Sequence, residues 1–367
     1  MPENGDVAVT GSVAALVLPV SAGRREGPVP AVHAVAPDRR RGVGLRSSQV
    51  GTPDQAGASL TSVRINRWWR ATAAGSGAMG ENNMVTEPGV ILGYGNLVGV
   101  SFEERVSAAA AAGADAIGYS VFEFQDARRA GITARDLAGI AERSGVRVAE
   151  LEIGLGFDGP ADGRRWQPAG FPWELPYMDA GVEQDLIELA GAFGAHHIVV
   201  TASTGGSGTA SAARFARLCD RAAEVGSKVA IEFLPGTDMP DIASALSVVQ
   251  AADRDNGGLC VDNWHFMRGN RDEAALRSLP ADRVVVVQLS DGPVAPRTDD
   301  YFEETLRHRA LFGDGDWDVA GFLATLRAAG ATAPVSIEIL SEHWQAQPVV
   351  ETAKVFVAAA RALENPV

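Results

Sequence analysis

The chain has 367 residues, of which 46% are hydrophobic, and its 32 Lys and Arg against 46 Asp and Glu give a formal net charge of −14. The length suits one large domain or two ordinary ones, and the acidic balance counts against a nucleic-acid partner, because such a surface repels phosphate backbones. The two cysteines exclude a disulfide scaffold, and no apolar run approaches the ~18–20 residues of a membrane-spanning helix, so we expect a cytoplasmic protein with no membrane partner.

The first part of the chain differs in composition from the rest. Residues 1–83 hold nine Arg, no Lys and six acids, a balance of +3, which leaves a balance of −17 for the remainder. The segment is rich in small residues and Pro and shows neither helical nor strand periodicity. We predict an extension over residues 1–86, either disordered or an artefact of a start site upstream of the true one, and one folded domain over residues 87–367.

From residue 89 onward, short apolar runs alternate with Ala-rich amphipathic stretches. The first expected helix begins after Ser101, which forms a capping box with Glu104, and it ends at Gly113. The predicted strands, in chain order, cover residues 90–94, 116–119, 146–153, 197–201, 229–233, 258–262, 284–289 and 335–340. The predicted helices cover residues 102–112, 133–144, 182–193, 210–225, 239–252, 273–278, 319–329 and 349–363.

This alternation predicts the fold class. Strands that alternate with helices indicate a parallel sheet with helical crossovers, and eight such units suit a closed (β/α)₈ TIM barrel of ~250 residues. A doubly wound open sheet is the alternative. No Gly-x-Gly-x-x-Gly turn follows the first strand and no phosphate-loop motif is present, which weakens the nucleotide-binding form of that alternative. We therefore predict an α/β protein, a TIM barrel preceded by a disordered extension.

Polar side chains stand at the ends of the last four predicted strands, namely Glu232, Asp262, Gln288 and Glu338. A carboxylate within an apolar strand is costly to bury unless it is paired or binds a metal. Because catalytic residues of a barrel lie at the carboxyl ends of its strands, the four side chains are expected to converge at one mouth. Their oxygen atoms suit Mn²⁺ or Mg²⁺, with Co²⁺ or Zn²⁺ less favoured. We predict a site for one divalent metal ion.

The ordered set resembles the xylose isomerase-like TIM barrels, the superfamily of sugar phosphate isomerases and epimerases. Glu232, Asp262 and Glu338 match the family's metal ligands directly, whereas Gln288 stands where His is commoner. Gln at that place resembles the dehydratase branch, which includes bacterial 3-dehydroshikimate dehydratases. The Asp-x-x-His pair of Asp262 and His265, and the run Gly313-Asp-Gly-Asp-Trp-Asp318, also fit the family.

The resemblance implies two reactions on a small polyhydroxylated carbonyl compound. In an isomerase or epimerase, the metal polarises the carbonyl while Glu232 and Glu338 remove and return a proton. In a dehydratase of the 3-dehydroshikimate or inosose type, His265 acts as acid or base and helps to expel a hydroxyl group as water. The sequence does not decide between them, and a homo-oligomer is expected from the resemblance alone.

Further residues are candidates for substrate binding. Arg309 could hold a carboxylate or phosphate, Glu152 at the end of the third strand could meet a substrate hydroxyl, and Trp264 could form an apolar wall. His197 begins the fourth strand, at the end away from the chemistry, and is expected to be structural. A barrel without catalysis remains a further alternative, and the complete set of candidate ligands argues against it.

Overall fold

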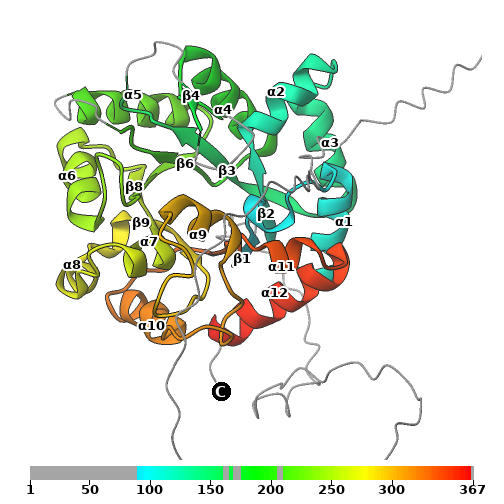
Figure 1. Cartoon of the computed structure of the whole chain (residues 1–367). Coiled ribbons are helices and arrows are strands. Elements are labelled where there is room, and N and C mark those ends of the chain that lie inside the picture. Colours follow the sequence, from blue (N-terminus) through cyan, green and yellow to red (C-terminus); the bar gives the residue numbers. More distant parts are fainter. Residues whose placement is uncertain (1–88, 160–164, 168–174, 205–209, 365–367) are drawn as a thin grey trace, which may run out of the picture. The chain divides into compact units, whose positions relative to one another are not determined.

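The computed structural model describes residues 89–159, 165–167, 175–204 and 210–364 (Figure 1). The extension predicted over residues 1–86 lies outside these residues. Among the described helices, none is long and apolar enough to cross a membrane. The described part therefore tests the predicted barrel and leaves the extension a prediction.

Eight parallel strands close into a barrel in the order β1-β10-β9-β8-β7-β6-β3-β2, which confirms the predicted TIM barrel. A separate antiparallel pair, β4 and β5, lies in the segment between β3 and α4. The strands are β1 (Val90–Leu92), β2 (Ala116–Ser120), β3 (Arg147–Leu155), β4 (Arg165–Trp166), β5 (Leu175–Pro176), β6 (His197–Thr201), β7 (Lys228–Glu232), β8 (Gly257–Asp262), β9 (Val284–Leu289) and β10 (Val335–Ile337).

Helices surround the barrel, as Figure 1 shows. They are α1 (Phe102–Ala112), α2 (Val121–Arg129), α3 (Ala134–Ser144), α4 (Ala180–Phe193), α5 (Ser211–Glu224), α6 (Ile242–Ala252), α7 (Asn263–Arg268), α8 (Glu273–Ser278), α9 (Tyr301–Arg307), α10 (Val319–Ala328), α11 (Glu342–Gln345) and α12 (Val349–Glu364). Two short 3₁₀ helices cover Tyr94–Leu97 and Ala281–Arg283.

The ends of the first helix follow the predicted capping chemistry. Ser101 accepts from the Glu104 N–H at 3.3 Å, and Glu104 accepts from the Ser101 N–H at 3.2 Å, so the capping box is confirmed. Gly113 ends α1 with φ of 71°, in the left-handed region where glycine carries no steric penalty. Thr133 and Asp136 form a second capping box at the start of α3. These local contacts fix where the crossover helices begin.

Several short elements were not predicted, and the first and last strands of the barrel end earlier than expected. Helices α2, α7, α9 and α11 have four to nine residues, which is too short to show a helical period. The first strand was predicted to reach residue 94, but the chain turns into a 3₁₀ helix at Tyr94. The last strand was predicted over residues 335–340 and ends at Ile337, because the Ile339 N–H donates to the Asn96 side chain at 2.7 Å instead of a neighbouring strand.

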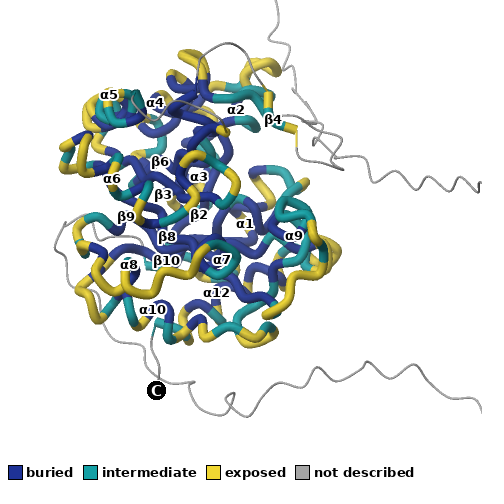
Figure 2. The backbone as a smooth tube through the Cα atoms, turned by 60° about the vertical axis from the view of Figure 1, so that its left-hand side comes forward, coloured by how far each residue is buried: buried dark blue, intermediate teal, exposed yellow. Residues whose placement is uncertain are grey.

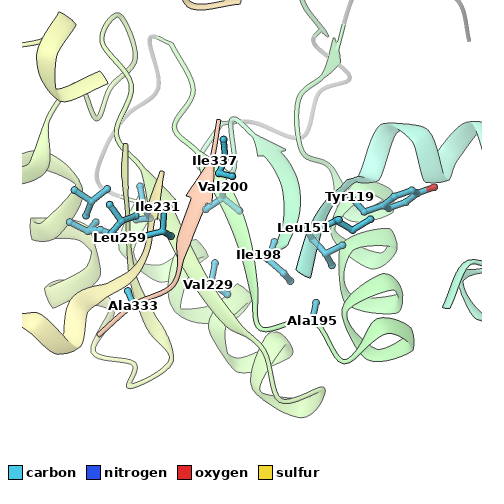
Figure 3. Close-up of a cluster of buried hydrophobic side chains, with 14 of the residues drawn as sticks. Tyr119, Leu151, Ala195, Ile198, Val200, Val229, Ile231, Leu259, Ala333 and Ile337 are labelled. Atoms are coloured by element: carbon cyan, nitrogen blue, oxygen red, sulfur yellow. The ribbon is translucent and has the colours of Figure 1, made fainter. Parts of the chain in front are cut away.

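Buried residues fill the centre of the molecule, and exposed ones lie on the outer helices and loops (Figure 2). One large apolar cluster joins the strands to the helices, and Figure 3 shows Ile198, Val200, Ile231 and Leu259 from three neighbouring strands within it. Val199, Ala230 and Cys260 alternate with these residues along the same strands and form a smaller cluster with Val285 and Val286 of β9. Because successive side chains of a strand point to opposite faces, Val199, Ala230 and Cys260 face the barrel interior.

Candidate metal centre and active site

The same alternation carries polar side chains into the barrel interior above the apolar residues. Glu232 is two residues past Ala230 on β7, and Asp262 is two residues past Cys260 on β8. Gln288 lies in β9, and Glu338 follows the last residue of β10. All four predicted ligands are buried, Glu338 being the most exposed at 8%. All four therefore lie at or just past the carboxyl ends of their strands, and their role as metal ligands stays a prediction.

Asp262 explains the position of His265. The Asp262 carboxylate ends β8 and caps α7, accepting from the Trp264 N–H at 2.7 Å. His265 therefore lies one turn into a helix, where its Nε2 is 3.0 Å from Glu232 Oε1 and 3.2 Å from Asp262 Oδ2. Ligand atoms of these three residues all lie within 4.8 Å of one another. The structure brings together two predicted metal ligands and the predicted catalytic histidine.

Arg309 links the third carboxylate to this group. Its Nη1 lies 2.9 Å from Asp262 Oδ2 and 2.9 Å from Glu338 Oε2. Burial raises the pKa of Glu338, and the neighbouring carboxylates Asp262 and Glu232 raise it further, against the effect of Arg309. Burial also acts to raise the pKa of Asp262, but Arg309 and His265 hold it below its ordinary value. Arg309, predicted as a substrate ligand, is here a buried partner of two carboxylates.

Gln288 and Glu152 meet in the barrel interior. The Cys260 thiol donates to Gln288 Oε1 at 2.9 Å, and Gln288 Nε2 donates to Glu152 Oε1 at 3.1 Å. Burial raises the pKa of Glu152 well above its ordinary value, and the nearby Glu150 adds to the effect. Glu152, predicted to meet substrate, thus contacts Gln288 from the opposite side of the barrel.

Below this layer, His197 supports Glu150. Its Nε2 lies 3.1 Å from Glu150 Oε2, and the Ser336 hydroxyl donates to Glu150 Oε1 at 2.8 Å. Burial acts to raise the pKa of Glu150, but the contacts with His197 and Ser336 contribute to holding it below its ordinary value. His197 is itself fully buried, as expected for a structural histidine at the start of its strand.

Trp264 is fully buried next to His265 in α7. Its Nε1 donates to Thr305 Oγ1 at 3.0 Å, and the guanidinium carbon of Arg309 lies 5.2 Å from the ring centroid. Arg268 lies 4.9 Å from the same ring. Trp264, predicted as an apolar wall, therefore packs against two arginines, and the attraction between each guanidinium and the face of the ring stabilises this packing.

Sequence reasoning missed Tyr301, and for Asp291 it leaves open whether the carboxylate orients a partner in the site or caps a loop. The Tyr301 hydroxyl contacts His265 Nδ1. Because 36 residues separate the two positions, no local sequence motif predicts this contact. Asp291 was recognisable as an acid three residues past Gln288. Its buried carboxylate accepts backbone N–H groups of the glycine-rich segment, including those of Gly313 and Trp317. It therefore anchors a loop.

The donor set fits a divalent cation. Three buried carboxylates (Glu232, Asp262 and Glu338) face one guanidinium, so negative charge remains for a bound ion to balance. Carboxylate oxygens with one imidazole nitrogen suit Mn²⁺ and Zn²⁺, and an all-oxygen set suits Mg²⁺. The combination with an imidazole is Glu232, Asp262 and His265. The all-oxygen combination is Glu232, Asp262, Gln288 and Glu338.

Residues 106–364 match the sequence model of the family described as xylose isomerase-like TIM barrel. The chain belongs to this family. The resemblance drawn from the strand-end residues is therefore confirmed at the level of the superfamily, whose members in the comparisons carry out more than one reaction.

Curated relatives of this xylose isomerase-like barrel include both kinds of enzyme. The 3-dehydroshikimate dehydratase of Pseudomonas aeruginosa is 32% identical over 133 residues, which are 36% of this chain and 21% of that protein. The inosose isomerase of Bacillus licheniformis is 28% identical over 144 residues, 37% of this chain and 50% of that protein. The matches span about a fifth of the dehydratase and half of the isomerase, so the activity of either is not transferred by the match alone.

Solved structures share the fold. The IolI protein, solved with a bound zinc atom, has a TM-score of 0.63 at 17% identity, covering 75% of this chain and 97% of that one. The D-allulose 3-epimerase of Methylomonas sp., solved with D-allulose, has a TM-score of 0.56 at 16% identity, covering 74% and 96%. At these identities the likeness concerns the barrel and not the substrate.

Proposed function

We propose that this protein is a divalent-metal-dependent cytoplasmic enzyme that removes a proton beside a carbonyl group of a small polyhydroxylated compound. The observation that carries the proposal is the convergence of Glu232, Asp262 and His265, with ligand atoms within 4.8 Å of one another, at the carboxyl ends of β7 and β8. Lewis-acid polarisation of a carbonyl, which makes the neighbouring proton acidic, is the chemistry that a divalent cation supplies in such a site.

Dehydration is the outcome that the arrangement supports best. His265 takes the proton from the carbon beside the carbonyl and returns it to the hydroxyl group one carbon further on, which leaves as water. A carbon–carbon double bond conjugated with the carbonyl remains. The contact with Tyr301 holds His265 for this role, and Gln288 and the 3-dehydroshikimate dehydratases among the relatives also favour it. The ligands in this case are Glu232, Asp262, Gln288 and Glu338.

Isomerisation or epimerisation is the second candidate, favoured by the inosose isomerases among the relatives. Here Glu232 and Glu338 act from two sides of the substrate, one removing the proton and the other returning it. The ion pair between Glu338 and Arg309 opposes this role, because a paired carboxylate is a weak base. Its raised pKa, which follows from burial, favours the role instead.

The test is proton exchange in D₂O with the Mg²⁺-loaded protein and, separately, the Mn²⁺-loaded protein, followed by NMR after the metal is removed. The substrates are 3-dehydroshikimate, an inosose and a panel of ketoses. Loss of a hydroxyl group with a new conjugated absorbance supports dehydration, and deuterium beside the carbonyl with every hydroxyl retained supports isomerisation. Glu232→Gln should abolish either reaction, whereas the exposed Glu342→Gln should leave it unchanged. Absence of exchange with every compound contradicts the proposal.

A further inference from the structure

The His265 ring is held from both of its nitrogen atoms. Nε2 faces Glu232 at 3.0 Å and Asp262 at 3.2 Å, and Nδ1 contacts the Tyr301 hydroxyl. In an imidazole, the hydrogen bond at one nitrogen determines which nitrogen carries the proton and how the ring is oriented. Tyr301 is the side chain on the far side of the ring from the carboxylates. It therefore governs how Nε2 is presented to them.

Helix α9, which carries Tyr301, is tied to the site by several buried contacts. Asp300 caps the helix, accepting from two backbone N–H groups at 2.9 and 3.0 Å. The fully buried Trp264 donates to Thr305 of α9 at 3.0 Å, and Arg268 donates to the buried Glu304 of α9 at 2.9 Å. Both side-chain contacts join α9 to α7, the helix that carries His265.

The residue after Tyr301 faces a different part of the chain. Phe302 packs edge-on against Trp166 of β4, with ring centroids 4.8 Å apart, and against Tyr301 at 5.2 Å. Trp166 is paired in turn with Leu175 of β5. The segment between β3 and α4 therefore contacts the segment between β9 and α10, although the two are far apart in sequence. Trp166, Phe302 and Tyr301 form a row of aromatic rings that ends at His265. Figure 2 shows β4 and α9 on the same side of the barrel.

We propose that Tyr301 is a positioning residue for His265, and that Trp166, packed on Phe302, holds Tyr301 in place. The role in turnover rests on the proposed function, whereas the effect on the His265 ring does not. The β4–β5 pair, which carries none of the predicted ligands, thereby becomes part of the machinery that orients the catalytic histidine. An aromatic contact of this kind stabilises the pair beyond the burial of apolar area and favours one ring orientation over another.

The first test needs no substrate. In the full chain loaded with diamagnetic Mg²⁺ or Zn²⁺, ¹⁵N NMR of the six histidines reports the tautomer of each ring, and His265→Asn identifies the His265 signals. Tyr301→Phe, which removes only the hydroxyl group, should shift the His265 nitrogen resonances toward those of a mixture of tautomers. The matched control is Tyr177→Phe, whose hydroxyl lies 3.3 Å from Thr204 and not against His265. Unchanged His265 resonances in Tyr301→Phe overturn the proposal.

The second test concerns Trp166 and turnover. Trp166→Ala should move the His265 resonances in the same direction as Tyr301→Phe, and Trp166→Phe should restore them by keeping a ring against Phe302. With an active substrate, Tyr301→Phe should lower kcat by about 10–100-fold with less than a threefold change in KM, as for partners that orient a site histidine. If kcat falls only in proportion to the fraction of folded protein, measured by circular dichroism, Tyr301 has a structural role only and the proposed positioning role is wrong.

The two proposals fail in distinguishable ways. If the wild-type protein acts on none of the carbonyl compounds while Tyr301→Phe still shifts the His265 tautomer, the proposed function is wrong and the positioning contact stands. If the wild-type protein is active and both Tyr301→Phe and Trp166→Ala leave kcat and the His265 resonances unchanged, the positioning role is wrong and the proposed function stands.

Discussion

Arg309 donates through Nη1 to Asp262 Oδ2 at 2.9 Å, and neither residue is more than 3% exposed. The same nitrogen pairs with Glu338 at 2.9 Å. Burial of a charged pair is costly, but removal of one partner costs more, because the other charge is left buried without compensation. One guanidinium thus stabilises two of the predicted metal ligands when no metal is bound.

Replacement of Arg309 should therefore destabilise the metal-free protein strongly. For Arg309→Leu we expect a loss of about 3–5 kcal/mol in the free energy of unfolding, measured by urea denaturation in EDTA. The surface variant Arg307→Leu, which breaks an exposed pair with Glu342, should cost at most about 1 kcal/mol. Similar costs for the two variants would show that the buried pairs contribute no more than an exposed one.

Replacement of Asp291 should also lower the free energy of unfolding. Its fully buried carboxylate accepts backbone N–H groups of Gly292 at 2.7 Å, Gly313 at 2.9 Å, Gly315 at 3.2 Å and Trp317 at 3.1 Å. In Asp291→Asn, an NH₂ group replaces one carboxylate oxygen and leaves two of these buried or part-buried N–H groups without their partner, each at about 1–3 kcal/mol. We expect a total loss of roughly 2–5 kcal/mol, measured by urea denaturation.

The control for this loss is Asp314→Asn, which removes the same charge from an exposed position in the same loop. It should change the midpoint of denaturation little. A loss in Asp291→Asn no greater than in Asp314→Asn would mean that the backbone N–H groups find other acceptors and that the loop does not depend on this carboxylate.

The two cysteines should be unreactive in the folded protein. Both are fully buried, and burial raises the pKa of Cys219 to about 12 and that of Cys260 well above its ordinary value. Since the thiolate is the reactive form, neither should react with Ellman's reagent at pH 8, and both should react once the chain is unfolded in guanidinium chloride. Cys219→Ala assigns the remaining thiol to Cys260. Rapid labelling of two thiols in the native protein would contradict the burial of Cys219 in α5 and of Cys260 in β8.

Most of the barrel could be predicted because its elements are governed by local rules. The strands predicted at residues 197–201 and 284–289 coincide with β6 and β9, where apolar runs are bounded by polar residues. The short helices were missed because they are too short to show a helical period, and two of them begin directly where a strand ends. Ser120 ends β2 and caps α2, just as Asp262 ends β8 and caps α7. A strand-ending Asp followed three residues later by His was the one available indication of α7.

The site could be predicted as a set of strand ends but not as a set of contacts. Parallel strands bring Glu232, Asp262 and Glu338 to the same mouth whatever their partners, so the convergence follows from topology. The contact partner of each carboxylate depends on long loops, whose conformation cannot be predicted from local sequence patterns. The loop after β9 delivers both Arg309 and Tyr301, and the binding of Gln288 to Cys260 and Glu152 depends on side-chain packing across the barrel interior.

The identity of the metal ligands is the last expectation to test: the sequence predicts the four strand-end residues, whereas the structure brings His265 together with Glu232 and Asp262, which both sets share. If the ligands are the four strand-end residues, Gln288→Leu and Glu338→Gln should each weaken Mn²⁺ binding at least tenfold, and His265→Asn should leave it within threefold. If the His265 imidazole is a ligand instead, His265→Asn should weaken Mn²⁺ binding at least tenfold, and Gln288→Leu and Glu338→Gln should each leave it within threefold. Isothermal titration of each variant with MnCl₂, after removal of metal by EDTA, measures the affinity.

Thermal unfolding measures the binding of Mn²⁺ to the folded protein independently. An ion present at 100 times its Kd stabilises the folded state by about 2.7 kcal/mol, so MnCl₂ should raise the Tm of the wild-type protein above its value in EDTA. Glu232→Gln should remove most of this rise under either ligand set, because its oxygen belongs to both. The exposed Glu342→Gln should keep the full rise. An undiminished rise in Glu232→Gln would place the ion elsewhere in the molecule and contradict both sets at once.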